Sequence, residues 1–525
     1  MRVELRDSLE FLYADSSVAK RPCCAMTVDV ARGGTAAVHV LVNVLKKGSL
    51  LRLAARQKGR AAAGAQWFRL VDVPVEVNTG PVGFIEKKGE RNRFVTRRAP
   101  FRVYDAMEPA GSAVRVSSPT QALRLHVPIP PEERPGMHEY EADIALGGEA
   151  RRLSFAVHVH KAVVPPVGRE SFPYTNWFSF ELMAGRHGLA PWTEAHWRQI
   201  GRYAEVMVHA RQNMFWVPLR DIFRAEGKMP VLDRERLRRI VRVFTEAGMH
   251  YIEGGHVATR TGGEWNATTF DTTVVRERAT SVEGNAVIAR IGRQLMEEIE
   301  RNGWRSRWIQ HATDEPTGTN AVDYRILVGM VRRHFPGVQV LDATMDPGLA
   351  GSVDIWCPQA QHYQRDRRRF EAQQKLGDRV WFYTCCFPGG PWLTRLLDME
   401  LLRPALFGWG AARFGLEGFL HWGLNHYRRG QDPFKKSVVG HGGGNFLPAG
   451  DTHVVYPGKD GPWSSLRLEA QREGFEDYEL LRRLKAREAR KTSRIIRIAF
   501  RAFDDYTKDV KEFRAARGAL LRSLP

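Results

Sequence analysis

From residue 169 onward, short apolar segments alternate with amphipathic segments of helical periodicity, and this alternation constrains the fold most strongly. Short apolar runs bounded by turn residues are typical of buried strands, and strands that alternate with helices form parallel sheets. Eight β-α units over roughly 300 residues predict a (β/α)8 TIM-like barrel. The candidate strands are residues 177–182, 213–219, 250–253, 308–313, 338–343, 353–357, 380–385 and 418–422.

The spacing of these strands also predicts what connects them. Helices are expected at residues 192–209, 233–247, 283–302 and 320–334. The fifth and sixth strands begin only 15 residues apart, so the helix between them is short or missing. A long loop at residues 257–279 is expected to cover the barrel mouth. A doubly wound sheet is the alternative, but no glycine-rich dinucleotide fingerprint follows any strand.

The first third of the chain has a different pattern. Residues 35–45, 68–77, 123–129 and 153–159 alternate apolar with polar or small side chains, which predicts antiparallel strands in a β-sandwich. Consecutive prolines at residues 165 and 166 end this pattern. The predicted fold class is therefore α/β: an antiparallel sandwich (1–165), a TIM-like barrel (170–485) and a basic C-terminal helical extension (486–525).

The formal net charge is +20, and the last 45 residues alone contribute +9. Such a charge suggests nucleic acid, an anionic membrane or an anionic glycan as partner. We expect no nucleic acid, because no zinc finger, RNA-binding signature or zipper occurs. We expect no membrane span, because no apolar run approaches about 18 residues. The sequence does not define an oligomeric state.

Cysteine usage and the N-terminus suggest a compartment. Four of the five cysteines form two adjacent pairs, which makes a poor disulfide framework and favours a reducing environment. The first residues are charged and lack the apolar stretch of a signal peptide, so a cytoplasmic protein is expected.

Two adjacent carboxylates, Asp314 and Glu315, stand at the end of the fourth predicted strand. In a barrel, function gathers at the C-terminal ends of the strands. Pro316 ends the strand and biases Glu315 towards an extended conformation, so both side chains can turn into one pocket. The alternative interpretation is a solvated turn.

Other polar and aromatic residues stand at or near the remaining strand ends. Flat rings with hydrogen-bonding edges suit sugars, although such rings also fill barrel cores. His158 and His160 share a strand face in the sandwich, and we interpret them as surface or packing residues. No metal site and no cofactor are expected. The candidate binding residues are Glu253, His256, His311, Trp356, Trp381, Tyr383, Trp422 and Asn425.

Five motifs in a fixed order resemble glycoside hydrolase family 123 and its relatives with a domain of unknown function 4091. They are W-I-Q-H-A-T-D-E-P (308–316), W-F-Y-T-C-C (381–386), G-F-L-H-W-G-L-N (418–425), A-G-D with V-Y-P-G (449–458) and S-L-R-L-E with R-E-G-F-E-D-Y (465–478). The resemblance runs from about residue 174 to residue 484.

The resemblance implies a retaining β-N-acetylgalactosaminidase that uses substrate-assisted catalysis. Glu315 would be the general acid and then the base, and Asp314 would hold the 2-acetamido N–H. Tyr383 would belong to the acetamido pocket, with Trp422 as a stacking wall and Asn425 as a further sugar contact. The implied partner is a glycan with a 2-acetamido sugar, and the basic surface either favours anionic glycans or maintains solubility.

Two further segments bear on the fold and on the leaving-group preference, and three alternative functions stay open. The spacing of Glu469, Arg472 and Glu476 puts them on one helical face, in a structural ion-pair role that closes the barrel. Residues 387–392 depart from the family pattern, which leaves the leaving-group preference open. The alternatives are a non-catalytic glycan-binding barrel, a glycosidase with another sugar specificity, and a nucleic-acid-associated protein that uses the basic tail.

Overall fold

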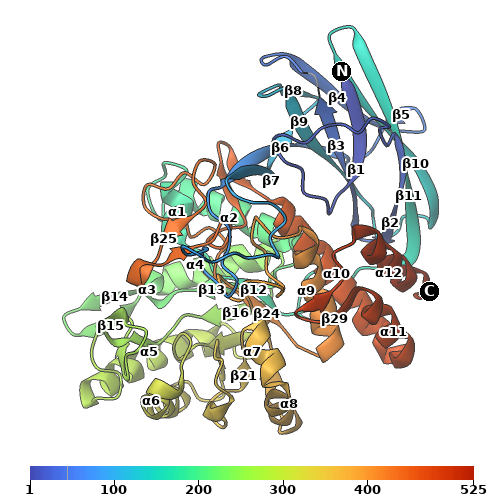
Figure 1. Cartoon of the computed structure of the whole chain (residues 1–525). Helices are drawn as coiled ribbons and strands as arrows, with labels where there is room; N and C mark the ends of the chain where they lie inside the picture. Colours follow the sequence, from blue (N-terminus) through green and yellow to red (C-terminus); the bar gives the residue numbers. More distant parts are fainter. Residues whose placement is uncertain (44) are drawn as a thin grey trace. The chain divides into compact units, whose positions relative to one another are not determined.

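A computed structural model of the chain describes residues 1–43 and 45–525, which form two compact units (Figure 1). The first unit consists of residues 1–166, 386–414 and 425–525, and the second of residues 167–385 and 415–424. The chain thus returns to the first unit twice. This division differs from the predicted limits of 170–485 and 486–525, whereas the predicted end of the first domain at 165 lies next to the observed division.

Two sheets in the first unit share one hydrophobic core, to which Val40 and Leu125 contribute from one sheet and Leu53 and Val157 from the other. The second sheet is mixed, because β2 pairs with β11 in parallel, so the predicted purely antiparallel pattern is wrong there. The first sheet has the order β1 (Arg2–Asp7), β3 (Thr35–Asn43), β9 (Thr120–Pro128), β6 (Gln66–Val75), β7 (Phe101–Ala110). The second has the order β2 (Ala25–Arg32), β11 (Glu149–Val163), β10 (Gly136–Leu146), β4 (Leu50–Gln57), β5 (Arg60–Ala61), with β8 (Ala113–Arg115) on β4.

Helices from the end of the chain complete the first unit. They are not a separate extension: Arg514 of α12 forms ion pairs with Asp7 of β1 (2.8 Å) and with Glu473 of α10. The helices are α9 (Leu402–Phe414), α10 (Leu466–Arg487), α11 (Ala489–Ala499) and α12 (Val510–Arg522). The short hairpins pair β25 (Val439–Gly440) with β26 (Phe446–Leu447), β27 (Tyr456–Gly458) with β28 (Gly461–Trp463), and β29 (Phe500–Ala502) with β30 (Asp505–Tyr506).

The predicted ion pairs on α10 are confirmed. Arg472 Nε lies 2.9 Å from Glu469 Oε2, and its Nη1 lies 2.6 Å from Glu476 Oε1. All three side chains are buried against the sheets of the first unit: Glu469 Oε2 lies 3.7 Å from His126 Nε2 of β9, and a Cβ on Gly34 would lie 3.3 Å from Glu476 Oε2. The predicted role of closing the barrel is not observed, since α10 belongs to the first unit.

The second unit contains parallel strands in two ladders. Seven of the eight predicted strands overlap observed ones. The first does not: its ladder ends at Asn176, and the Ser179 side chain accepts a hydrogen bond from the Leu182 N–H and so caps helix α1. One ladder has the order β13 (Met214–Val217), β16 (Tyr251–Gly254), β19 (Trp308–Gln310), β20 (Gln339–Asp342), β21 (Ile355–Trp356), β22 (Arg379–Val380). The other has the order β12 (Tyr174–Asn176), β24 (Phe419–His421), β23 (Phe382–Tyr383).

Within the described part of the chain, these ladders do not close into a barrel of hydrogen-bonded strands. Between β12 and β13, side-chain amides occupy the backbone groups that a ladder would use. Gln212 Nε2 donates to the carbonyl oxygens of Asn176 (3.3 Å) and Met214 (2.8 Å), and Asn213 Oδ1 accepts from the Tyr174 N–H. At the other junction, Trp381 separates β22 from β23.

Helices follow most of the parallel strands, as the hydrophobic periodicity predicts. Only a 3-10 turn (Pro347–Leu349) lies between β20 and β21, which confirms the missing helix. None of the helices in residues 1–43 and 45–525 combines the length and apolar character needed to cross a bilayer. The helices are α1 (Phe180–Gly185), α2 (Glu194–His209), α3 (Leu219–Ile222), α4 (Arg234–Ala247), α5 (Val282–Arg301), α6 (Ala321–His334), α7 (Ala360–Arg365) and α8 (Arg367–Lys375). Two hairpins pair β14 (Phe223–Glu226) with β15 (Met229–Leu232), and β17 (Ala258–Arg260) with β18 (Phe270–Thr272).

A buried ion pair joins distant segments of the first unit. The Arg467 guanidinium lies 2.9 Å from Asp105 Oδ2, both side chains are fully buried, and the Tyr456 hydroxyl donates to the same carboxylate oxygen. Arg467→Ala leaves this carboxylate buried without its cation, so we expect the free energy of unfolding to fall by about 3–5 kcal/mol. Urea denaturation measures the change.

The matched control is Arg501→Ala, which removes the exposed ion pair with Asp505. Exposed pairs contribute about 1 kcal/mol or less, so this variant should unfold near the wild-type midpoint. Equal losses in both variants would contradict the assignment of Arg467 to a buried, stabilising network.

Candidate active site

Functional side chains of the second unit gather where its parallel strands end. The ladders pair Trp216 with Glu253 and Asn176 with His421, and the Thr175 hydroxyl donates to Glu253, so the ends of both ladders lie together. Because successive side chains in a strand point to opposite faces, only alternate residues at that edge face the interior. The structure therefore decides which of the candidate side chains named from the sequence face the interior.

His311 is the centre of a buried polar network. It directly follows β19, and its side chain is fully buried. Its Nε2 lies 2.8 Å from Glu253 Oε1, and its Nδ1 lies 3.2 Å from Asp342 Oδ1. Burial lowers the pKa of His311, but the hydrogen bonds and charges of the two carboxylates outweigh it and raise that pKa to about 9. At neutral pH His311 is therefore an imidazolium that donates to both carboxylates.

Each carboxylate beside His311 is held by further donors. Glu253 accepts from the Thr175 hydroxyl (2.5 Å) and from Trp177 Nε1 (2.8 Å). Asp342 accepts from the Tyr324 hydroxyl (2.6 Å) and from the backbone N–H groups of residues 312 and 313. These bonds fix both carboxylates and, through them, the orientation of the imidazolium ring.

Aromatic rings form one wall beside this network. The indoles of Trp177 and Trp216 stack with ring centroids 4.7 Å apart, and the His256 ring meets each of them edge-on at 5.1 Å. Burial, with the nearby charge of His311, holds the pKa of His256 well below its usual value. His256 is thus a neutral, half-buried ring beside a cation, and Trp177 is also half-buried.

Asp314 and Glu315 lie just beyond β19 and are half-buried. Glu315 has φ = +48°, so the extended conformation expected before Pro316 is not adopted. A positive φ is costly for a side chain with a Cβ and persists only where its surroundings hold it. Here Arg260 donates to the Glu315 carbonyl oxygen, and the Thr344 hydroxyl donates to the Pro316 carbonyl oxygen at 2.9 Å.

The two adjacent carboxyl groups both have a raised pKa. Burial and the Glu315 charge raise the pKa of Asp314 to about 7, against the opposing charge of Arg260. Burial raises the pKa of Glu315, although the Tyr383 hydroxyl donates a hydrogen bond to Glu315 Oε1 and opposes the rise. The pair can therefore retain one proton near neutral pH, as a general acid requires.

The predicted loop at 257–279 forms the β17–β18 hairpin, and it brings Arg260 to the carboxylate pair. The Arg260 guanidinium lies over the exposed Trp265 ring, 4.2 Å from its centroid. Asp323 of α6 anchors the hairpin by accepting from the Phe270 N–H (3.0 Å) and from Arg278.

Two predicted sugar contacts, Trp356 and Trp381, are wrong because both side chains are fully buried in the fold. Trp356 is fully buried and points away from the interior: its Nε1 donates to Asp378 and its ring packs on Phe370 of α8. Trp381 faces the interior but is fully buried against Gly418, whose Cβ would lie 2.2 Å from the ring. Neither ring offers a surface to a substrate.

The remaining predicted sugar contacts, Tyr383, Trp422 and Asn425, lie in three different places. Tyr383 lies two residues after Trp381 on the same face, with its hydroxyl on Glu315. Trp422 directly follows β24 and is half-buried. Asn425 belongs to the first unit, where it is buried and forms a bridge with His453.

Sequence reasoning missed Asp342, Arg260, Trp177 and Trp216. Asp342 and Trp216 lie near the ends of predicted strands, so reading every strand end for polar and aromatic residues would have found them. Arg260 carries no such signal, because its place depends on the folding of a hairpin. A group able to hold a metal ion, namely Asp29, His158 and His160, occurs in the first unit.

The charge of His311 can be tested directly. With a pKa of about 9 it should remain an imidazolium at pH 7.5, whereas His256, with its lowered pKa, should be neutral at the same pH. Because the folded pKa lies above the unfolded value of about 6.5, this interaction stabilises fully below that pH and is lost as pH rises through about 9. NMR of protein labelled with 15N-histidine reports both rings.

The spectrum of His311→Asn assigns the His311 signal by its disappearance, and His138→Asn serves as the control on a half-buried ring of the first unit. A His311 signal that titrates with a midpoint at or below about 6.5 would refute the carboxylate-bound imidazolium.

Comparisons with known proteins bear on the family and on the fold of the chain. A family 123 glycoside hydrolase from Clostridium perfringens, studied for glycolipid glycan hydrolysis, has a similar fold with a TM-score of 0.74 at 12% identity, over 99% of this chain and 96% of that one. A β-D-glucuronidase from Dictyoglomus thermophilum has a TM-score of 0.37 at 10% identity, over 90% and 69% of the chains, a score too low to carry an argument. No curated protein matches the sequence.

Residues 249–484 match the model of the glycoside hydrolase 123 catalytic domain, a range that includes His311, Asp314, Glu315 and Tyr383. The match supports glycosidase activity and, with it, a glycan as substrate. The predicted resemblance of this chain to glycoside hydrolase family 123 is therefore confirmed.

Proposed function

We propose that the protein is a retaining β-N-acetylgalactosaminidase that uses the 2-acetamido group of its substrate as the nucleophile. The observation that carries the proposal is the adjacent, half-buried pair Asp314 and Glu315: burial raises the pKa of both carboxyl groups, and the Glu315 charge raises the pKa of Asp314 further. Glycosidases that use a protein nucleophile hold two carboxyl groups about 5 Å apart across the scissile bond. Consecutive residues on one side of a pocket suit a reaction in which the substrate supplies the nucleophile.

In the first step, Glu315 donates its proton to the glycosidic oxygen as the bond from that oxygen to the anomeric carbon breaks. The acetamido carbonyl oxygen forms the new bond to the anomeric carbon and gives an oxazolinium ion. Asp314 accepts a hydrogen bond from the acetamido N–H and stabilises the positive charge that develops there. The leaving group departs as an alcohol.

In the second step, the Glu315 carboxylate removes a proton from water, and the water oxygen bonds to the anomeric carbon. The bond to the acetamido oxygen breaks, which restores the acetamido group and retains the β configuration. The same residue thus acts first as acid and then as base, which its raised pKa permits.

Tyr383 and the aromatic wall supply positioning. In the free protein the Tyr383 hydroxyl donates to Glu315, so the second carboxyl oxygen of Glu315 is the one that carries the proton. A bound substrate offers its acetamido carbonyl as a competing acceptor, and transfer of this hydrogen bond would orient the nucleophile. Trp177 and Trp422, both half-buried beside strand ends, offer ring faces to the sugar.

The proposal extends to the architecture of the two units. The second unit has eight strand positions with parallel registers, β12, β13, β16, β19, β20, β21, β22 with β23, and β24. We propose a TIM-type barrel whose closure uses side-chain amides, preceded by a two-sheet sandwich. The basic surface would favour anionic glycans or maintain solubility, and competition by a chondroitin-type oligosaccharide separates these roles.

Glu315→Gln should lower kcat on an aryl β-N-acetylgalactosaminide by about 10³-fold, because the glutamine amide cannot protonate the leaving oxygen. The loss should shrink with a dinitrophenyl leaving group, which departs without a proton. Asp314→Asn should also lose activity with the dinitrophenyl substrate, because Asp314 acts on the acetamido group. Release of the phenol measures all three rates.

The matched control is Glu264→Gln, an exposed carboxylate on the same hairpin as Arg260, which should keep wild-type turnover. An aryl β-galactoside lacks the internal nucleophile and should not react. Paired galacto- and gluco-configured acetamido substrates report the specificity. Wild-type inactivity on both would refute the glycosidase. Glycan affinity unchanged in Glu315→Gln, with no turnover, would favour a non-catalytic glycan-binding barrel.

The pH profile gives an independent prediction. The carboxyl pair loses its remaining proton as pH rises through about 7, so kcat/KM should fall on the alkaline side with an apparent pKa near 7. The residual activity of Glu315→Gln on the dinitrophenyl substrate should lose this alkaline limb. An alkaline limb that persists unchanged in this variant would assign the proton to another group.

A further inference from the structure

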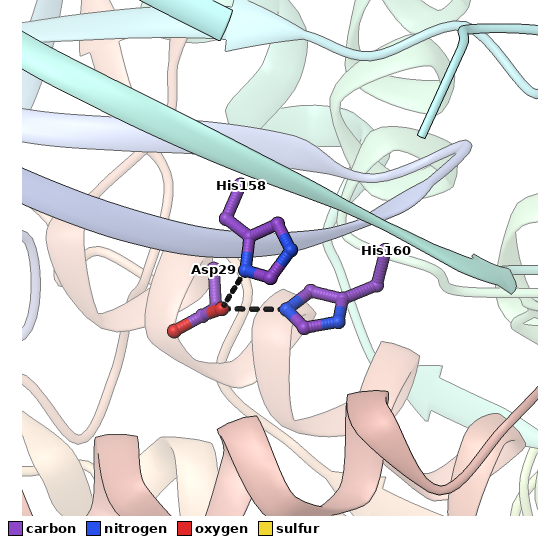
Figure 2. Close-up of side chains that lie close together, drawn as sticks. All are labelled: Asp29, His158 and His160. Carbon is purple, nitrogen blue, oxygen red and sulfur yellow. Dashed lines mark hydrogen bonds and ion pairs between the residues drawn. The ribbon is translucent and has the colours of Figure 1, made fainter. Parts of the chain in front are cut away.

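A second cluster of titratable side chains lies in the first unit, on its mixed sheet. Asp29 belongs to β2, and His158 and His160 belong to β11 (Figure 2). The parallel ladder pairs His158 directly with Asp29. Because strand side chains alternate in direction, His160, two residues further, lies on the same face. Two adjacent strands thus hold all three side chains in place.

The three side chains converge on one point. His158 Nδ1 lies 3.1 Å and His160 Nε2 lies 2.5 Å from the same oxygen, Asp29 Oδ1 (Figure 2). One ligand atom from each residue lies within 4.8 Å of the others. Metal–ligand bonds of about 2.0–2.1 Å in a tetrahedral site place ligand atoms somewhat over 3 Å apart, so His158 Nδ1 already lies near this separation from Asp29 Oδ1, and His160 Nε2 would move outward on binding.

Burial differs across the cluster in a way that suits a bound ion. The His160 side chain is only 5% exposed, whereas His158 is 37% and Asp29 is 31% exposed. One flank is therefore enclosed by protein, and the other is open to solvent. Such a site can hold an ion and leave a coordination position for water.

Arg517 does not compete with a metal ion for the Asp29 carboxylate. Arg517 of α12 donates to the backbone carbonyl oxygen of Asp29 at 2.7 Å. Its guanidinium is itself balanced by Asp477 (2.9 Å) and Glu473 (3.3 Å). Arg517 thus fixes the backbone of β2 without occupying the carboxylate oxygens that a metal would use.

We propose that Asp29, His158 and His160 bind a divalent transition-metal ion, with Zn²⁺ as the best fit. Two imidazole nitrogens and one carboxylate oxygen are borderline ligands that suit zinc, whereas Mg²⁺ and Ca²⁺ select oxygen-rich sites. β2 lies at the edge of its sheet, so the ion would join this edge strand to β11. The site replaces the earlier interpretation of both histidines as surface or packing residues.

The experiment uses the full chain, freed of metal with a chelator and titrated with Zn²⁺. We expect one equivalent to bind at about micromolar concentration or below, and His160→Ala to weaken binding by at least about 100-fold. Because ions that bind only the folded state stabilise it, the thermal midpoint should rise with Zn²⁺ in the wild type and not in the variant. Co²⁺ provides a spectroscopic probe, since its visible absorption reports nitrogen coordination.

His138→Ala is the matched control. His138 lies on β10 of the same sheet, and its ring forms a hydrogen bond with the Arg134 carbonyl oxygen. This variant should bind Zn²⁺ as the wild type does. If His160→Ala fails to fold, Asp29→Asn and the half-exposed His158→Ala report on the same site. Binding that is absent from the wild type, or equal in all variants, would overturn the proposal and leave a cluster held by hydrogen bonds alone.

Discussion

The candidate site depends on one buried charge, the imidazolium of His311. A cation without solvent is stable only where anions and hydrogen bonds replace water, and here Glu253 and Asp342 do so from the strands on either side. Those carboxylates are in turn held by Thr175, Trp177 and Tyr324. The network thus connects the ends of four strands. Asp314 and Glu315, which act on the substrate in the proposed mechanism, lie just beyond β19, the strand that ends next to His311.

This arrangement also explains why ladder closure is dispensable at β12. Thr175 and Trp177 flank the end of that strand and bind Glu253 of β16, so side-chain hydrogen bonds hold β12 in register beside its neighbours. Gln212 and Asn213 do the same from the start of β13. Polar side chains take the place of backbone pairing, and they fix the strand only because they are buried and their partners are satisfied.

The sequence predicts the succession of strands and helices along the second unit well, because apolar periodicity and turn residues are local properties. Seven strands, four helices and the Asp314–Glu315 pair follow from such patterns. Partners that meet across the fold do not: nothing local links Asp342 to His311 or Arg260 to Glu315. Trp356 shows the remaining limit, because a one-residue difference in position reverses the face to which a strand side chain points. The division into units was missed for the same reason, since the packing of α10 against α9 is a long-range contact.

The electrostatic balance of the site favours a shared proton on the carboxyl pair. His311 and Arg260 bring two positive charges, and Glu253 and Asp342 bring two negative ones, so the surroundings of the pair are close to neutral. If Asp314 and Glu315 were both ionised, they would add two uncompensated negative charges in a half-buried space. If the pair retains one proton, only a single charge is added. The positive φ of Glu315 turns this residue away from the direction of the strand, and Tyr383 selects one of its oxygens as acceptor. A carboxyl pair that retains one proton in a fixed orientation is therefore a consequence of charge balance together with the backbone geometry that Arg260 and Thr344 maintain.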